Sequence, residues 1–224
     1  MNKIINALSQ CQIFAGLNPS QIETQIATVP YRVCDFDKNQ FISREDQHSV
    51  NIGIIIYGCV EIQKVLPSGN VICIFHKNSG ATFGGSVVFS SKSVYPCDVF
   101  SRDKSQILFF HKSSFVQLCQ NPVVAENLLT TFANQILYYE KRLELFAYSS
   151  IQKKIAFYLL NEMKLTNSPI IHLPFTKTSW AEYLNVSRPS LSRELKKLAS
   201  QGIIRLKLNN IVIINQHALE CLLR

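Results

Sequence analysis

The sequence predicts an α+β protein: an N-terminal β-roll, then a long helix, then a small helical domain that ends in a β-ribbon. Three observations predict this order. Short apolar runs separated by turn residues fill residues 30–111. A heptad pattern of apolar residues extends over residues 125–146. Two short helical patterns joined by a tight turn lie within residues 176–202.

The β-roll prediction rests on five strand candidates, at residues 52–57, 60–66, 71–76, 97–101 and 106–110. Turn residues separate them at Gly58 and at residues 67–70, and a helix is expected in front, at residues 19–27. Many short strands with regular turns are typical of a barrel, a double-stranded β-helix or a jelly roll. We therefore expect an effector or sensor domain at residues 1–120.

A segment rich in small residues, SGATFGGSVVFSS, lies between the expected strands at residues 79–91. We call this segment the glycine loop. Its glycines can expose backbone N–H groups to a ligand. The same composition suits a plain connecting turn, and the residues alone leave both interpretations open.

The helix expected at residues 122–146 carries apolar residues that alternate by four and three positions. After Ala125 these residues form what we call the heptad seam: Leu129, Phe132, Ile136, Tyr139, Leu143 and Phe146. The repeat favours a coiled-coil homodimer with this seam at the interface, and a helix buried within one subunit is the alternative. We expect a dimerisation helix at residues 121–147, followed by a hinge at the sequence Ala-Tyr-Ser-Ser, residues 147–150.

Residues 176–202, TKTSWAEYLNVSRPSLSRELKKLASQG, predict a helix-turn-helix. Asn185 falls in the turn, where a left-handed backbone is required, and Asn tolerates that conformation. Ser187 is a good N-cap for the second helix, and Pro189 lies in the first turn, where a missing N–H costs little. The buried sides of the two helices are expected to consist of Trp180, Ala181, Leu184, Leu191, Leu195 and Leu198.

The other side of the second helix carries polar and basic residues, which we call the polar face: Ser187, Arg188, Pro189, Ser190, Ser192, Arg193, Lys196 and Lys197. Arg can bond both acceptors of guanine, and Lys and Ser can hold phosphates. An ordinary solvated helix surface is the alternative. Two expected strands, 203–208 and 211–214, joined at Asn209-Asn210, would add a wing. Residues 148–224 therefore predict a winged helix-turn-helix that binds DNA, with Arg205 and Lys207 available for backbone contacts.

Charge is unevenly distributed along the chain, whose formal net charge is +8. Residues 151–224 contain 11 Lys and Arg against 4 Asp and Glu, whereas residues 1–150 contain 12 against 11. Such asymmetry indicates a C-terminal part that binds a polyanion. A membrane surface is the competing polyanion, but basic residues on a patterned helix with a wing favour nucleic acid.

Other classes of protein find little support in the sequence. The seven cysteines are scattered and include no C-x-x-C pair, which predicts reduced thiols in a cytoplasm and no zinc or iron–sulfur site. Residues 1–20 lack the apolar core of a signal peptide, and the longest apolar stretch, 52–57, is too short to span a bilayer. No nucleophile–base motif or P-loop is present, so an enzyme is not expected.

The order of these parts resembles the Crp/Fnr superfamily of bacterial transcription regulators, most specifically in FTKTSWAEYLNVSRPSLSRELKKLASQGII and GATFGG. The resemblance implies a cyclic-nucleotide-binding-type β-roll, a homodimer on a palindromic site in double-stranded DNA, and RNA polymerase as a partner. It also implies that Arg188 and Arg193 approach bases or phosphates, and that Thr176 and Thr178 lie near the DNA backbone. Pro189 departs from the family pattern, because many members have a Glu there that reads a base.

The glycine loop departs further from the family pattern. Cyclic-nucleotide binders carry a Glu after the Phe-Gly pair and, later, an Arg for the phosphate, whereas here Gly85 follows and residues 93–96 are Ser-Val-Tyr-Pro. A buried phosphate without an Arg would be poorly compensated, so cyclic AMP or GMP is disfavoured and no cofactor is predicted. A small organic effector is expected instead, in a pocket formed by Phe83, Gly84, Gly85, Ser86, Tyr95, Tyr138 and Tyr139.

Three alternatives remain for the signal. Haem sensing would use His76, Cys73 or His111, although a lone histidine at a strand end is more often packed or exposed. Redox sensing would use Cys97 or Cys11. The oxygen-sensing branch is disfavoured, because its iron–sulfur cluster needs several N-terminal cysteines. A regulatory subunit that binds a ligand and acts on a protein partner is a different class, and the basic winged helix argues against it.

Overall fold

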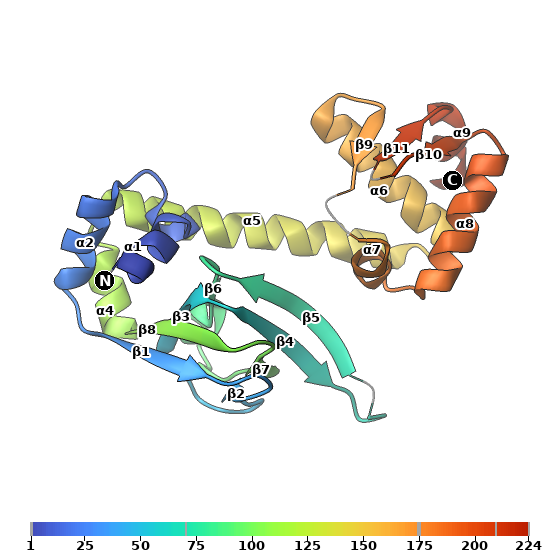
Figure 1. The fold of residues 1–224 in the computed structure, drawn as a ribbon. Coiled ribbons are helices and arrows are strands. Elements are labelled where there is room, and N and C mark those ends of the chain that lie inside the picture. Colours follow the sequence, from blue (N-terminus) through green and yellow to red (C-terminus); the bar gives the residue numbers. More distant parts are fainter. Residues whose placement is uncertain (1, 70, 174–175, 209, 224) are drawn as a thin grey trace. The chain divides into compact units, whose positions relative to one another are not determined.

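The computed structural model describes residues 2–69, 71–173, 176–208 and 210–223. The chain folds into two compact units, residues 1–135 and residues 136–224 (Figure 1). No helix among the described residues is both long enough and apolar enough to cross a membrane.

Two four-stranded antiparallel sheets form the β-roll of the first unit. The first has the order β1-β8-β3-β6, and the second has the order β2-β7-β4-β5. Their strands are β1 (Tyr31–Phe36), β2 (Phe41–Ser43), β3 (Asn51–Tyr57), β4 (Cys59–Val65), β5 (Val71–Asn78), β6 (Thr82–Phe83), β7 (Asp98–Ser101) and β8 (Ser105–His111). All five expected strands are present, within two residues at each end. The interior of the roll is apolar and includes the buried side chains of Ile55, Val60, Phe83, Val99 and Phe109.

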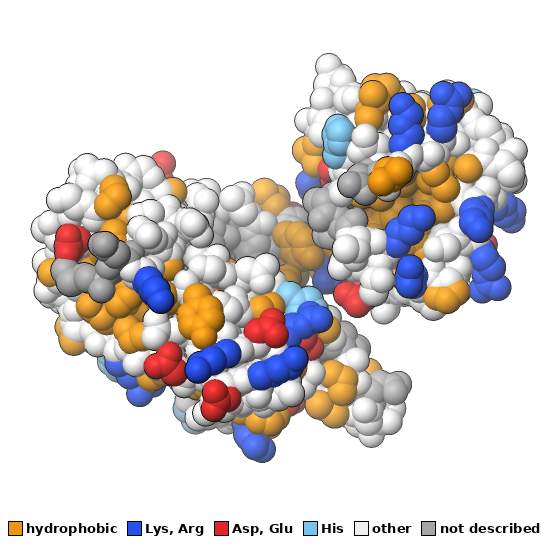
Figure 2. Space-filling view, viewed as in Figure 1, with side chains coloured by type: hydrophobic (Ala, Val, Ile, Leu, Met, Phe, Trp, Pro, Cys, Tyr) orange, Lys and Arg blue, Asp and Glu red, His pale blue; other side chains and the backbone are white. Residues whose placement is uncertain are grey.

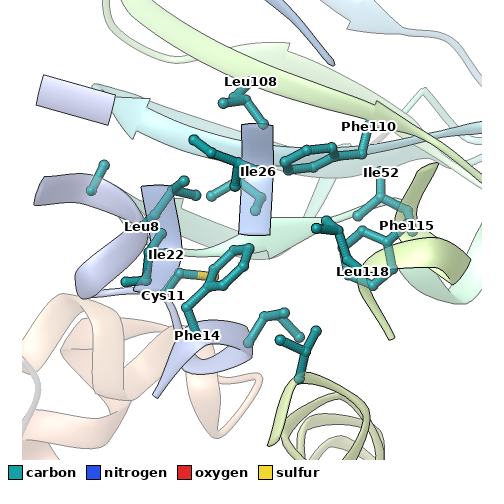
Figure 3. Close-up of a cluster of buried hydrophobic side chains, with 14 of the residues drawn as sticks. Leu8, Cys11, Phe14, Ile22, Ile26, Ile52, Leu108, Phe110, Phe115 and Leu118 are labelled. Carbon is teal, nitrogen blue, oxygen red and sulfur yellow. The ribbon is translucent and has the colours of Figure 1, made fainter. Parts of the chain in front are cut away.

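Helices pack on one end of this roll and complete its second core (Figure 3). They are α1 (Asn2–Ser9), the 3-10 helix η1 (Gln12–Phe14), α2 (Pro19–Ala27), α3 (Gly85–Val88) and α4 (Lys112–Leu118). Leu8, Phe14 and Ile22 point from the N-terminal helices toward Phe110 and Phe115. Local residues determine where α2 starts. The Asn18 side chain accepts a hydrogen bond from the Gln21 N–H, and Pro19 occupies the first turn.

The long helix is α5 (Pro122–Ala147), which begins in the first unit and ends in the second. Val124 is buried in the core of the first unit, and Leu145 is buried in the core of the second. Most of the heptad seam is exposed: Leu129 and Leu143 are each 69% exposed, and Ile136 is 58% exposed. A long helix therefore carries an unusual stripe of exposed apolar side chains.

The second unit is a winged helix. Its elements are α6 (Ile151–Thr166), β9 (Ile170–His172), α7 (Lys177–Tyr183), α8 (Arg188–Ser200), β10 (Ile204–Leu206), β11 (Asn210–Ile213) and α9 (Gln216–Leu223). The strands form an antiparallel sheet in the order β10-β11-β9. Its core gathers buried residues from α6, α7, α8 and the sheet, together with Leu219 of α9 and Leu145 of α5.

The wing differs in detail from its expected form. The strand expected at residues 203–208 is three residues long, and Leu208 is almost fully exposed. Asn210 belongs to β11, and its carbonyl accepts a hydrogen bond from the Lys207 N–H, so the turn begins earlier than the predicted Asn209-Asn210 pair. Asn209 itself lies outside the described residues. Pairing with β9, a strand that we did not expect, fixes the register of β11.

Candidate DNA-binding interface

The turn of the helix-turn-helix has the left-handed residue that the sequence predicted. Asn185 adopts a left-handed backbone with φ of 52°, which turns the chain between α7 and α8. The Val186 N–H then donates to the Ala181 carbonyl at 2.9 Å. Ala181 is buried, and a larger side chain there would push the two helices apart.

A chain of hydroxyl groups begins α8 and reaches Arg193. Ser187 is the N-cap: its Oγ accepts from the Ser190 N–H at 3.2 Å and donates to Ser190 Oγ at 2.8 Å. Ser190 Oγ in turn accepts from Nη2 of Arg193 at 3.2 Å. The capping bonds therefore also restrict the guanidinium of Arg193, which lowers the entropy it would lose on binding a ligand.

The two sides of α8 differ sharply. Leu191, Leu195 and Leu198 are buried in the core, as expected. On the polar face, Arg188, Pro189, Arg193, Lys196 and Lys197 are exposed, and Ser190 and Ser192 are half-buried. Among the described residues, no residue of α8 forms a salt bridge within the chain. Figure 2 shows blue Lys and Arg side chains on the part of the second unit where Figure 1 draws α8. This surface therefore offers cationic donors to an anion outside the chain.

Lys154 of α6 donates a hydrogen bond at the start of the turn between α7 and α8. Nζ of Lys154 donates to the Leu184 carbonyl, at the end of α7, at 3.0 Å. Partial burial lowers the pKa of Lys154. A cation at a helix C-terminus also interacts favourably with the helix dipole. Lys154 therefore positions the polar face without belonging to it.

Two more predicted contacts flank α8. Thr176 is the N-cap of α7, and its Oγ1 accepts from the Ser179 N–H at 3.1 Å, while Thr178 is exposed within that helix. In the wing, Arg205 and Lys207 are exposed. Exposed hydroxyl and basic groups beside α8 are the types that contact phosphates in protein–DNA complexes.

The glycine loop uses its glycines for packing. Gly84 has φ of +80°, and a Cβ added there would lie 2.7 Å from Oη of Tyr95 and 3.0 Å from the Asn51 carbonyl oxygen. Phe83 and Tyr95 are both buried in the interior of the roll. Burial raises the pKa of Tyr95, and hydrogen bonds with Ser49 and Ser43 partly offset this effect. Three predicted pocket residues, Phe83, Gly84 and Tyr95, thus lie in one tightly packed region of the first unit, whereas Gly85 is half-buried and Ser86 is exposed.

The two predicted pocket tyrosines of α5 lie in the second unit. The Tyr138 ring packs against Tyr183 of α7 with centroids 6.3 Å apart, and Arg142 lies over both rings. Tyr139 lies beside Tyr138 and is partly exposed. Tyr138 is therefore a neighbour of the helix-turn-helix, a contact that the sequence did not indicate.

The side chains considered for haem and redox sensing occupy different surroundings. His111 caps α4, where its Nδ1 accepts from the Ser113 N–H at 3.2 Å. Cys11 and Cys97 are buried, and burial raises their pKa values, that of Cys11 to about 11. Because the thiolate is the reactive form, burial disfavours reaction at both cysteines. Cys73 and His76 lie together on β5, with Sγ and Nε2 3.3 Å apart.

Comparison with known families assigns both units. Residues 153–222 match the Crp-like helix-turn-helix domain, and residues 33–122 match the cyclic nucleotide-binding domain. The first match spans most of the second unit, including α7, the turn and α8.

Individual relatives cover nearly the whole chain. The cyclic AMP receptor protein of Thermus thermophilus is 20% identical over 194 residues, which are 87% of this chain and 88% of that protein. The crystal structure of the Thermus thermophilus catabolite activator protein has a TM-score of 0.54, 18% identity and coverage of 95% and 98%. FixK2 from Bradyrhizobium japonicum has a TM-score of 0.54, 20% identity and coverage of 87% and 98%. At these identities the structural likeness establishes the fold.

Proposed function

Because this chain belongs to the Crp/Fnr superfamily of transcriptional regulators, we propose that it binds specific palindromic sites in double-stranded DNA as a homodimer, under the control of a small effector. Its C-terminal helix-turn-helix is a DNA-binding domain of that type. The exposed polar face of α8, which forms no salt bridge among the described residues, is the observation that carries the proposal.

The role of α8 is tested by Arg193→Ala. Arg193 is exposed and already oriented by Ser190, so its loss removes a base or phosphate contact without disturbing the buried leucines. We expect affinity for a DNA fragment selected from random sequence to fall at least tenfold, which corresponds to a loss of about 1.4 kcal/mol or more. Fluorescence anisotropy at fixed salt measures the effect.

Lys164→Ala is the matched control for Arg193→Ala. Lys164 lies in the last turn of α6, is exposed, and carries the same charge away from α8. We expect this variant to bind within about twofold of the wild type, because it alters only the distant electrostatic field. Equal losses for both variants would mean that net charge, and not the polar face, holds DNA. Unchanged binding by Arg193→Ala would contradict the assignment of α8.

The homodimer proposal is supported by the exposed heptad seam. Leu129 and Leu143 are both a-type positions of the repeat and are 69% exposed within one chain. Covering such a stripe removes apolar surface from water, and members of this superfamily act as dimers. Two copies joined along α5 would also present two polar faces to a palindromic site.

The dimer is tested by Leu143→Glu, which places a charge on the seam. We expect sedimentation equilibrium to find a monomer for this variant and a dimer for the wild type. Leu137→Glu is the matched control, because Leu137 is 55% exposed but lies beside the seam. That variant should remain dimeric. A monomeric wild type, or a dimeric Leu143→Glu variant, would refute this interface.

The proposed effector is not a cyclic nucleotide. Residues 90–96, where the family carries its phosphate-binding Arg, contain one cation, Lys92, and it is exposed. Gly85 and Ser86 provide no carboxylate for a ribose hydroxyl. We expect calorimetry with cyclic AMP and cyclic GMP to detect no binding with Kd below about 1 mM. Saturable binding tighter than this would contradict the proposal.

A further inference from the structure

Three side chains that can bind metal ions meet on the β-roll, away from the helix-turn-helix. One ligand atom each from Glu61 on β4 and from Cys73 and His76 on β5 lies within 4.8 Å of the other two. We call them the Glu–Cys–His cluster. It is the only group of three such side chains that the described part of the chain brings together. Carboxylate, thiolate and imidazole are the three common protein ligands of zinc.

A β-bulge makes the cluster possible. Cys73 and His76 are three residues apart, and in a regular strand such residues face opposite sides of the sheet. Between β4 and β5, however, Ile62 pairs with Phe75 while Gln63 pairs with Cys73, which leaves an extra residue on β5. The extra residue turns Cys73 to the face occupied by His76 and by its partner across the ladder, Glu61.

The distances within the cluster suit a single small ion. Sγ of Cys73 is 3.3 Å from Nε2 of His76, and Oε2 of Glu61 is 3.3 Å from Nδ1 of the same ring. Two ligand atoms bound to one tetrahedral zinc are about 3.5 Å apart, since each bond is about 2.0–2.3 Å long. A small rotation of the imidazole therefore brings one of its nitrogens into a common coordination sphere with the other two groups.

From this geometry we propose that Glu61, Cys73 and His76 bind one divalent transition-metal ion, with Zn²⁺ as the favoured ion. A mixed set of one sulfur, one nitrogen and one oxygen suits zinc and its neighbours better than it suits Mg²⁺ or Ca²⁺. The thiol of Cys73 releases its proton to solvent on binding, because the thiolate is the ligand. Cys73 and His76 are exposed, which leaves the fourth position to water.

Arg102 competes with the ion. Its Nη1 lies 2.9 Å from Nδ1 and 3.0 Å from Nε2 of His76, and 3.8 Å from Oε2 of Glu61. The positive charge of this guanidinium would repel a metal ion bound to the cluster. The Arg102 side chain is 52% exposed, however, and can move into solvent. The proposal therefore predicts that binding displaces Arg102, and that removing its charge strengthens binding.

The test uses the full-length, reduced protein after treatment with a chelator. We expect calorimetry to find one Zn²⁺ per chain with Kd below about 1 µM. Cys73→Ser and His76→Gln should each weaken binding more than about a hundredfold, beyond the loss typical of groups that only orient a ligand. Co²⁺ should produce a thiolate-to-metal absorption band that is absent from Cys73→Ser. Arg102→Gln should bind Zn²⁺ a few-fold more tightly than the wild type.

The chain contains a matched control for nonspecific binding by thiols. On α9, Sγ of Cys221 lies 3.5 Å from Nε2 of His217, another exposed Cys–His pair. Cys221→Ser should leave both the Zn²⁺ affinity and the Co²⁺ band unchanged. Binding weaker than the stated limit, or binding that survives Cys73→Ser and His76→Gln, would overturn the proposal. All the altered side chains are partly or largely exposed, and circular dichroism of each variant verifies that it is folded.

Discussion

The polar face of α8 and the glycine loop are the two stretches in which this chain most resembles its superfamily, and the structure uses them differently. On α8, the basic side chains are exposed, and Ser190, itself bonded to Ser187, restrains Arg193. In the loop, Phe83 and Tyr95 are buried, and Gly84 provides room for the tyrosine hydroxyl. A motif shared with the superfamily can therefore form an exposed basic surface in one unit and mainly a packing arrangement in the other.

The sharpest test of this contrast is Gly84→Ala. A Cβ there meets Oη of Tyr95 at 2.7 Å, and the backbone must also keep φ of +80°. We expect unfolding free energy to fall by about 3 kcal/mol, from overpacking and left-handed strain together. Denaturant unfolding followed by circular dichroism measures it.

Gly69→Ala provides the comparison for that loss. Gly69 has a similar φ of +81°, but an added Cβ finds nothing within 4 Å. Only the backbone strain remains, so we expect a loss of about 1 kcal/mol. If Gly84→Ala and Gly69→Ala lost equal stability, tight packing would not explain why residue 84 is a glycine.

An effect smaller than that of Gly84→Ala is expected from Tyr95→Phe, which removes the hydroxyl that bonds Ser49 and Ser43. The loss at neutral pH should be about 1.5 kcal/mol. Because burial raises the pKa of Tyr95 in the folded state, the unfolded tyrosine ionises first, near its ordinary value of 10. The wild type therefore loses stability as pH rises above 10, and the variant should lose less. Tyr57→Phe, which alters an exposed tyrosine, should leave the alkaline loss unchanged.

The last test concerns α8, where the expected loss of stability is as small as that of Gly69→Ala. Ser187→Ala removes the N-cap of α8 and should cost about 1 kcal/mol of stability. It also removes the bond that holds the Ser190 hydroxyl, the partner of Arg193, so DNA affinity should fall although both arginines of the polar face are unchanged. If affinity held while stability dropped, the hydroxyl chain would have no role in orienting Arg193.

Features set by neighbours in the chain were predictable from sequence. The cap at Ser187, the left-handed Asn185 and the start of α2 at Pro19 all depend on residues within one or two turns. The heptad seam was equally visible, and its exposure leaves it available to a partner. In α8, residue types alone indicated both the buried leucines and the basic polar face.

Features set by long-range pairing were not predictable. The strand β9 is three residues long and is defined by its ladder with β11. The spacing of the cysteines predicted no metal site, because a bulge that brings Cys73 beside His76 leaves no signature in the sequence. Likewise, nothing in the order of residues indicated that Tyr138 would pack on Tyr183.

One buried side chain allows the stability of the second unit to be measured by itself. Trp180, the chain's single tryptophan, lies in the winged-helix core, its ring centroid 5.4 Å from that of Tyr158. Among the described residues its indole N–H has no hydrogen-bond partner. Emission excited at the red edge of protein absorption therefore comes from the second unit alone. Its change on heating reports melting of that unit without an added dye, and circular dichroism of the same sample reports both units.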